Sequence, residues 1–291
     1  MDLDDSCYRL IDFGAGRKLE SLAGYVIDRP SPAAVGTVAR DPSRWKHASA
    51  AYDSDKRLWE HRLPWPAGLL IECGGFEMPV RPTPYGHIGL FPEQHENWCW
   101  LGSPDHDSRV EQAEERAALN LFGYTGASTV ALARAGYSVA HVDAAKPNVQ
   151  AARQAAEQNN LGDAPIRFLV DDSAKFAARE IRRQRKYQTV ILDPPAYGHS
   201  PKGKAWRLER DLWPLLNDCL QLLDQSSFRL LVTGHSPEVG HREVLEFLRQ
   251  TAFLKPFQRS SRLIIESGRS QLRDEGDRSL DAGFFVRVQT P

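Results

Sequence analysis

Residues 118–143 read Ala118-Leu-Asn-Leu-Phe-Gly-Tyr-Thr-Gly-Ala-Ser-Thr-Val-Ala-Leu-Ala-Arg-Ala-Gly-Tyr-Ser-Val-Ala-His-Val-Asp143, and this stretch sets the fold class. The apolar runs at 118–122 and 138–142 predict two strands. Between them, a glycine-containing turn leads into a small-residue segment, 128–135, which predicts a helix that a serine caps and a glycine ends. Two strands joined by such a helix form the unit from which parallel sheets are built.

The same alternation continues toward the C-terminus. Further strands are predicted at 166–170, 189–192, 228–232, 262–266 and 284–288, and further helices at 146–160, 173–185, 207–223 and 238–250. This order predicts a Rossmann-like α/β fold, with a mainly parallel seven-stranded sheet and helices on both faces. Ligands of such sheets bind beyond the carboxyl ends of the strands, so the loops after residues 122, 142, 170 and 192 should meet at one crevice.

Residues 1–107 differ from the rest in being rich in Pro, Gly and Trp. Short segments at 8–11, 25–28, 68–72 and 76–80 are bounded by turn residues and predict strands. We therefore expect a smaller β-rich N-terminal domain over 1–107, with a role in substrate recognition, and a catalytic domain over 108–291.

Bulk composition restricts the class of protein. Of the 291 residues, 41% are hydrophobic and 26% charged, which is ordinary for a globular protein. The formal net charge is -1, so any attraction to nucleic acid must come from local patches. The acidic N-terminus and the lack of a long apolar run predict a cytoplasmic protein that does not enter a membrane. The 4 Cys form no C-x-x-C pair, so we expect no metal site.

The first loop, Asn120–Ser128, follows a strand and opens a helix. Gly123 and Gly126 permit a tight turn and a close approach to a ligand, and the helix N-terminus favours a carboxylate or phosphate. The loop lacks the G-x-G-x-x-G pattern of dinucleotide-binding proteins. Glycines that serve only turn geometry and packing are the alternative.

Acidic residues end the second and third strands. Asp143 is placed to accept both ribose hydroxyls of an adenosine, a device shared by NAD and S-adenosylmethionine (SAM) enzymes. Its alternative role is to cap the following helix. In the third loop, Asp171 or Asp172 can accept the adenine amino group, and Asp171 can equally cap the helix that starts at Ser173.

The fourth loop, Val190-Ile-Leu-Asp-Pro-Pro-Ala-Tyr197, carries the most specific signal. Pro194 and Pro195 fix two successive φ angles and make a stiff corner after an apolar strand. Such a corner can aim Asp193 and nearby carbonyls at a substrate nitrogen. Tyr197 can stack on a base.

Together these loops resemble the ribosomal RNA large-subunit methyltransferase family, in which some members make 5-methylcytosine and others 7-methylguanine. The resemblance runs from about residue 76 to the C-terminus and includes Gly86-His-Ile-Gly-Leu-Phe-Pro-Glu-Gln94, which is similar to the family's G-x-x-x-G-x-F-x-D-Q segment. It implies a class I methyltransferase fold, SAM as the cofactor and RNA, of ribosomal origin, as the substrate.

The resemblance also implies roles for individual residues. The first loop and Asp143 hold SAM, Asp172 faces the adenine, and Asp193 lies beside the transferred methyl group. The implied cofactor-binding residues are Asn120, Phe122, Gly123, Tyr124, Thr125, Gly126, Asp143, Asp172, Ser173 and Asp193, and the catalytic residues are Asp193, Pro194, Pro195 and Tyr197.

The chain departs from the family in two places. The N-terminal region does not clearly match the RNA-binding PUA domain of some members. Cytosine-C5 enzymes carry a catalytic Cys after the fifth strand, where this chain reads Val232-Thr-Gly-His-Ser-Pro237. Without a thiolate the covalent route to C5 is closed, whereas a nitrogen lone pair needs no adduct. Cys219 lies on an apolar helix face and is interpreted as a core residue. For His235 the alternatives are a base, a substrate contact, or a loop residue that bonds only to the backbone.

Basic residues and tryptophans suggest where a substrate binds. Three basic clusters stand out, either as phosphate contacts or as solvated surface: Arg179, Arg182, Arg183, Arg185 and Lys186; Lys202, Lys204, Arg207 and Arg210; and Arg269, Arg273 and Arg278 in a polar loop. Trp45, Trp59, Trp65, Trp98 and Trp100 either stack on bases or pack the small β domain.

Four functions are therefore compared. The first is methylation of an RNA base nitrogen without a covalent adduct, and the second is methylation of a small molecule or a protein. The third is an NAD-dependent oxidoreductase, against which the missing G-x-G-x-x-G argues. The fourth is a non-catalytic RNA-binding relative. A homodimer is an open expectation.

Overall fold

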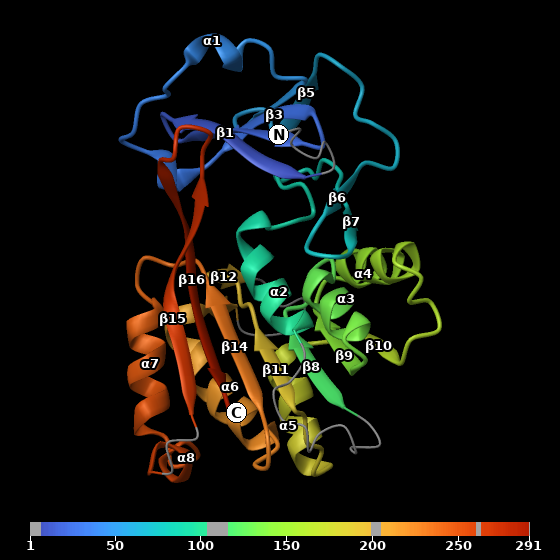
Figure 1. Cartoon of the computed structure of the whole chain (residues 1–291), viewed down its shortest axis with the longest axis vertical. Helices are drawn as coiled ribbons and strands as arrows, with labels where there is room; N and C mark the ends of the chain where they lie inside the picture. The colour runs from blue at the N-terminus through green and yellow to red at the C-terminus, as the bar shows by residue number, and fades with distance from the viewer. Residues whose placement is uncertain (1–6, 104–115, 199–204, 260–262, 291) are drawn as a thin grey trace. The chain divides into compact units, whose positions relative to one another are not determined.

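The computed structural model describes residues 7–103, 116–198, 205–259 and 263–290, and the chain divides into two compact units (Figure 1). The first unit is Met1–Trp98 with Ser270–Ala282, and the second is Cys99–Arg269 with Gly283–Pro291. The boundary predicted at residue 107 lies outside the described residues. The sequence does not predict that residues 270–282 belong to the first unit. A strand that runs from one unit into the other keeps the same alternation of side chains, so its pattern does not mark the boundary.

The first unit is built on a five-stranded sheet with the order β1–β2–β3–β4–β5. Its elements are β1 (Tyr8–Gly14), β2 (Arg17–Leu22), β3 (Tyr25–Pro30), η1 (Pro32–Ala34), α1 (Pro42–Trp45), β4 (Ala50–Asp53) and β5 (Leu58–His61), followed by the paired β6 (Leu70–Glu72) and β7 (Glu77–Pro79) and by η2 (Pro92–Gln94). The predicted β-rich N-terminal region is therefore confirmed. The strands β2, β4 and β5 were not predicted, because polar residues interrupt their apolar alternation.

Tryptophans pack against other rings inside this unit. The ring centroids of Trp59 and Trp65 are 5.9 Å apart, and each indole also contacts a tyrosine, Tyr52 at 5.4 Å and Tyr25 at 5.1 Å. Trp98 lies 5.9 Å from Phe76. These contacts agree with the packing interpretation for Trp59, Trp65 and Trp98. Trp100 instead lies in the second unit, with the Arg229 guanidinium 4.4 Å from its ring centroid.

A seven-stranded sheet with the order β10–β9–β8–β11–β14–β16–β15 forms the centre of the second unit (Figure 1). The elements are α2 (His95–Gly102), β8 (Ala117–Leu121), α3 (Ala127–Arg134), β9 (Ser138–Asp143), α4 (Lys146–Gln158), β10 (Ile166–Val170), α5 (Ser173–Arg182), β11 (Thr189–Leu192), β12 (Tyr197–Gly198), β13 (Trp206–Arg207), α6 (Leu208–Leu222), β14 (Arg229–Gly234), α7 (His241–Gln250), α8 (Lys255–Arg259), β15 (Ile264–Arg273) and β16 (Ser279–Gln289). Three of these elements include residues assigned to the first unit, which are 95–98 of α2, 270–273 of β15 and 279–282 of β16.

The pairing of these strands confirms the predicted fold class. β10, β9, β8, β11 and β14 pair in parallel, and β16 pairs antiparallel with β14. The chain moves outward from β8 through β9 to β10 and then returns to β11. Right-handed crossovers in opposite directions place their helices on opposite faces, in agreement with the packing of α3 on α4 and of α5 on α6.

Two local predictions need correction. Ser128 does not cap α3: the N-cap is Gly126, in the left-handed conformation with φ 93°, because the loop needs a residue without a Cβ there. Arg269, Arg273 and Arg278 do not lie in one polar loop. Arg269 and Arg273 belong to the edge strand β15, and only Arg278 lies in the turn that joins β15 to β16.

The apolar faces of the sheet and helices α5, α6 and α7 share one buried core. Cys219 on α6 is 0% exposed within it, and burial raises the pKa of the Cys219 thiol. The interpretation of Cys219 as a core residue is therefore confirmed, and a buried neutral thiol is a poor nucleophile.

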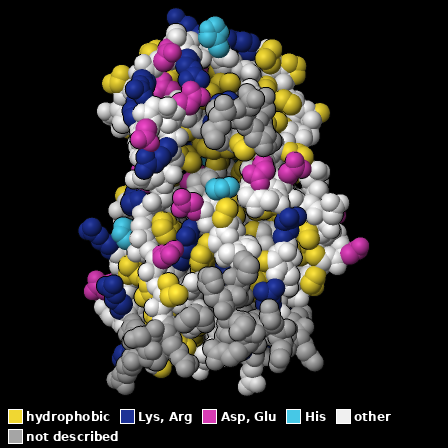
Figure 2. All heavy atoms as spheres, viewed as in Figure 1, with side chains coloured by type: hydrophobic (Ala, Val, Ile, Leu, Met, Phe, Trp, Pro, Cys, Tyr) yellow, Lys and Arg dark blue, Asp and Glu magenta, His cyan; other side chains and the backbone are white. Residues whose placement is uncertain are grey.

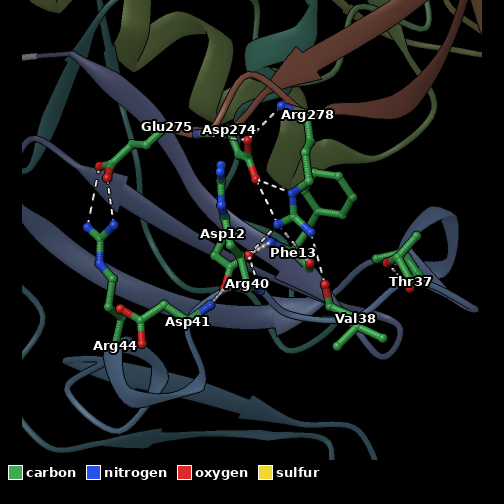
Figure 3. Close-up of polar contacts among 12 residues, drawn as sticks. Asp12, Phe13, Thr37, Val38, Arg40, Asp41, Arg44, Asp274, Glu275 and Arg278 are labelled. Atoms are coloured by element: carbon green, nitrogen blue, oxygen red, sulfur yellow. Dashed lines mark hydrogen bonds and ion pairs between the residues drawn. The ribbon is translucent and has the colours of Figure 1, made fainter.

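The turn between β15 and β16 contributes a buried ion cluster to the first unit (Figure 3). Arg278 pairs with Asp274 at 2.7 Å and with Asp12, and its guanidinium lies 4.3 Å above the Phe13 ring. Burial alone would raise the pKa of Asp12, but hydrogen bonds from the Trp45 indole and from backbone amides outweigh it and lower that pKa.

Replacing Arg278 with Met should destabilise the first unit strongly, because Asp12 and Asp274 are 2% and 6% exposed and would lose their shared cation. We expect a loss of roughly 2–4 kcal/mol in the free energy of unfolding, below the range for fully buried pairs because the Arg278 side chain is 32% exposed. Urea unfolding measures it. Arg273→Met is the matched control: its partner Asp277 is 82% exposed, and a change of about 0–1 kcal/mol is expected. Equal losses in both variants would contradict the cluster's role.

Candidate functional site

The carboxyl ends of the central strands lie in one row. In register, Leu121 of β8 pairs with Val142 of β9 and with Leu192 of β11, and Leu192 pairs with Val232 of β14. The loops that follow these strands therefore start at the same edge of the sheet. The row includes the point between β8 and β11 where the strand order reverses, which is where open α/β sheets bind ligands.

The loop after β8 holds its backbone in an unusual conformation. Phe122 and Tyr124 have φ angles of 58° and 49°, which side-chain-bearing residues adopt at a cost of about 1–3 kcal/mol. Two hydrogen bonds of 3.0 Å, from Gly123 N–H to Val142 O and from Gly126 N–H to Gly123 O, close the turn. Such strain in a strand-end loop is typical of a ligand-binding turn.

Both glycines of this loop are also required by packing. A Cβ on Gly126 would lie 2.7 Å from the Ala152 Cβ, and a Cβ on Gly123 would lie 2.5 Å from ring atoms of His141. The alternative that these glycines serve packing is therefore part of the answer, and it is compatible with a role of the loop in binding. Thr125, between them, is half-buried.

Helix α3 directs its N-terminus toward this edge of the sheet. Its first intrahelical hydrogen bond runs from Val130 N–H to Gly126 O at 2.8 Å. The amides of residues 127–129 therefore precede the first intrahelical donor, as in every helix N-terminus, and they carry the positive end of the helix dipole. This arrangement suits a carboxylate.

Asp143, the last residue of β9, is 8% exposed and holds the first loop in place. Its Oδ2 accepts a hydrogen bond from Tyr124 N–H at 2.9 Å, and its Oδ1 accepts from Ala145 N–H at 2.8 Å and from Asn148 Nδ2 at 3.1 Å. Because a carboxylate has about four acceptor positions, capacity for a ligand hydroxyl remains. Asp143 is not the N-cap of α4, which is Ala145.

In the loop after β10, Asp172 and not Asp171 caps the following helix. The N-cap of α5 is Asp172, whose Oδ1 accepts from Lys175 N–H at 3.0 Å. Asp171 instead pairs with Arg179 and accepts from Asp172 N–H at 2.8 Å. Capping uses one oxygen of Asp172, so the other stays available to an adenine amino group. Ser173 is buried as the first residue of the helix.

Asp193 directly follows β11 and is oriented by a neighbouring strand. Thr233 on β14, which is 1% exposed, donates its hydroxyl proton to Asp193 Oδ1 at 2.5 Å. Asp193 N–H continues the ladder to Leu121 O at 3.4 Å. The carboxylate is therefore held at the strand end, next to the loop after β8.

The diproline corner is closed by a short ladder. Tyr197 and Gly198 pair with Arg207 and Trp206 as β12 and β13. The Trp206 indole N–H donates to Pro195 O at 2.8 Å, and its ring lies 5.0 Å from that of Phe122. Trp206 thus contacts both the first and the fourth loop.

Side chains on this corner differ in exposure. Pro194 is buried and Pro195 is exposed. Tyr197 is 53% exposed, with the Arg207 guanidinium 5.9 Å from its ring centroid. An exposed aromatic ring with an arginine beside it suits stacking on a planar group.

Three polar residues of the site were missed or left unassigned in the sequence. Thr233 falls in the quoted loop after the fifth strand but has no motif of its own. Thr129 and His141 look like ordinary helix and strand residues, yet both are 0% exposed and lie beneath the first loop, where Asn120 Nδ2 donates to Thr129 Oγ1 at 2.9 Å. The side chain of Asn120 therefore supports the loop from below.

The basic clusters are partly engaged within the chain. Arg179 pairs with Asp171, Arg183 with Glu180 and Arg210 with Asp211, while Lys202 and Lys204 lie outside the described residues. Figure 2 shows cations and acids interspersed over the face drawn there. Binding of phosphates by these clusters stays a prediction.

Within the described ranges, no helix is both long and apolar enough to cross a membrane. In the same part of the chain, no three His, Cys, Asp or Glu side chains are grouped so that they would hold a metal ion.

The chain is similar to known proteins along most of its length, although no protein-family model matches it. The crystal structure of the SAM-dependent methyltransferase from Agrobacterium tumefaciens aligns with a TM-score of 0.84 and 31% identity, over 96% of this chain and 89% of that one.

Among curated proteins, the chain is 33% identical over 207 residues to ribosomal RNA large subunit methyltransferase I of Escherichia coli, covering 67% of this chain and 49% of that protein. It is 29% identical over 168 residues to ribosomal RNA large subunit methyltransferase K/L of Methylococcus capsulatus, covering 57% of this chain and 22% of that protein. The chain thus spans half or less of the length of these two relatives.

Proposed function

Because the chain belongs to the SAM-dependent methyltransferases, we propose that it transfers a methyl group from SAM to a nitrogen atom of an RNA base. The observation that carries the proposal is the common row of strand ends, which starts the glycine loop, Asp143 and Asp193 from one edge of the sheet. In this proposal Asp143 binds the cofactor and Asp193 contacts the substrate.

The residues at this edge fit the parts of SAM. Asp143 accepts the ribose hydroxyls, and the second oxygen of Asp172 accepts the adenine amino group. The amides at the start of α3 meet the methionine carboxylate. Gly123 and Gly126 let the loop turn tightly over the residues beneath it, because a Cβ at either position would meet His141 or Ala152. Phe122, Tyr124, Thr125 and Ser173 complete the cofactor surface in this proposal.

When bound, SAM supplies a methyl group on a positively charged sulfur, which a nitrogen lone pair can attack in line. Asp193 accepts a hydrogen bond from the target N–H and so directs the lone pair toward the methyl group. As the new N–C bond forms, the nitrogen becomes positively charged, and Asp193 stabilises that charge and holds the departing proton. The corner at Pro194 and Pro195 keeps the carboxylate from turning away.

Nitrogen is favoured over cytosine C5 because the loop after the fifth strand offers no thiol. The loop 232–237 contains no Cys, and Cys219 is fully buried on α6. Attack on C5 needs a thiolate at C6 first, whereas a nitrogen lone pair needs only orientation and a proton acceptor. His235, an exposed residue of the same loop, is proposed as a substrate contact.

An RNA substrate is supported by the names of the ribosomal RNA methyltransferases to which the chain is similar. The exposed Tyr197 ring, with Arg207 beside it, can stack on an unpaired base while a phosphate binds nearby. We propose that the first unit contributes to substrate recognition, and a homodimer stays a prediction.

Two measurements test this function. Calorimetry should show that the purified chain binds SAM but not NADH; binding of NADH alone would contradict the proposal. Mass spectrometry of RNA nucleosides from cells with and without the gene should then show one methylated base that disappears. If the nucleoside that disappears in cells without the gene is 5-methylcytosine, the nitrogen assignment is refuted. An unchanged nucleoside profile would point to a small-molecule or protein substrate.

A further inference from the structure

We infer that His141 is a positioning residue whose imidazole sets the height of the cofactor loop above the sheet. The inference rests on the proposed function, in which that loop binds SAM. His141 lies on β9 two residues before Asp143, so both side chains leave the strand on the same face. The loop after β8 therefore rests on two side chains, one aromatic ring and one carboxylate.

A buried hydrogen-bond chain holds the His141 ring. Asn120 Nδ2 lies 2.9 Å from Thr129 Oγ1, and Thr129 Oγ1 lies 2.9 Å from His141 Nδ1. All three residues are at most 2% exposed, and the Phe168 ring lies 5.7 Å from the imidazole. The ring is thus fixed from the strand side and from the helix side, and its position does not depend on solvent.

Gly123 shows that the ring touches the loop backbone. A Cβ there would lie 2.5 Å from His141 Nδ1 and 3.2 Å from Nε2. Gly126 has a positive φ angle, and so do Phe122 and Tyr124 on either side of Gly123. The φ angle of Gly123 itself is not positive. The backbone conformation of residue 123 would accept a side chain, and the nearest obstacle to a Cβ there is the His141 ring.

The remaining ring nitrogen is buried. His141 Nε2 is buried and has no hydrogen-bond partner among the described residues, and burial lowers the pKa of His141 to about 4. The ring is therefore neutral near pH 7 and acts by its shape. A buried polar atom without a partner costs free energy, so a purely apolar residue would suit the core better unless the ring serves the loop.

A size swap between the two positions tests the inference. Gly123→Ala should weaken SAM binding about tenfold or more, because the loop must rise off the ring. Adding His141→Ser should restore the affinity to within about threefold of the native value, because the smaller side chain makes room for the new Cβ. Calorimetry with SAM measures the affinity, and thermal unfolding without SAM measures folding separately.

Gly126→Ala combined with His141→Ser is the matched control. The Cβ at position 126 meets Ala152 and the φ is 93°, so the serine should not rescue this variant. If the paired variant at position 123 binds as weakly as Gly123→Ala alone, His141 does not set the loop height and the inference falls.

Single variants separate positioning from simple support of the fold. His141→Ser should raise the KM for SAM about tenfold and leave kcat within about twofold, while His141→Asn, which keeps a polar group toward Thr129, should lie nearer the native enzyme. A lower unfolding temperature with an unchanged KM would indicate support of the fold only and would overturn the inference. If the native chain does not bind SAM, the proposed function fails instead, and the unfolding data still report whether positions 123 and 141 are coupled.

Discussion

Alanine in place of Asp193 should lower kcat for methyl transfer by about 10²–10⁴-fold and leave the affinity for SAM within about threefold of the native value. The carboxylate follows β11 at the row of strand ends, and Thr233 orients it through a 2.5 Å hydrogen bond. Without it, nothing in the proposed mechanism aligns the target nitrogen or stabilises its positive charge. Single-turnover assays with saturating SAM, alongside calorimetry, measure the two quantities independently.

Two variants make the result specific to the carboxylate. Asp193→Asn keeps the shape and should remain strongly impaired, because an amide does not take the proton. Thr233→Val is nearly isosteric and removes the orienting hydroxyl, so a smaller loss of about tenfold is expected. Turnover by Asp193→Ala close to that of the native enzyme would remove Asp193 from the mechanism.

Alanine in place of Asp143 should weaken SAM binding by about a hundredfold or more. The change removes the acceptor proposed for the ribose hydroxyls and also the partner of Tyr124 N–H, which holds the strained loop. Losing a charged hydrogen-bond partner costs about 1.5–3 kcal/mol, and a hundredfold change in Kd is about 2.7 kcal/mol.

The matched control for that variant is Asp163→Ala, since Asp163 is an exposed acid in the turn before β10. Its affinity for SAM should equal that of the native chain. Circular dichroism and thermal unfolding show whether Asp143→Ala still folds. A folded Asp143→Ala chain with native affinity would place the cofactor elsewhere.

Much of the catalytic fold was predictable because its signal is local. The strands at 166–170 and 189–192 were predicted at their observed bounds, since each is an apolar run with a polar or proline stop. The edge strand pair was predicted too short. Most positions of β15 are exposed or partly buried and many are polar, so its length is not evident from an apolar pattern.

The site was predictable to the level of its loops but not of its contacts. The strand-end positions of Asp143 and Asp193 follow from the order of elements, because parallel strands end at one edge. The choice between Asp171 and Asp172 as a cap depended on backbone angles that no pattern encodes. His141 and Thr233 act through partners more than ten residues away in the sequence, so neither pattern nor spacing could identify them.

The division of the chain has a consequence for how this protein can be taken apart. The backbone passes between the two units three times, after Trp98, after Arg269 and after Ala282. A protease that nicks only the first passage would leave residues 270–282 covalently attached to the second unit, and the N-terminal fragment would stay bound to them through noncovalent contacts such as the Arg278–Asp12 ion pair. The second unit therefore cannot be separated or exchanged by a cut at one place. Any chimera must carry residues 270–282 together with the N-terminal segment that surrounds Arg278.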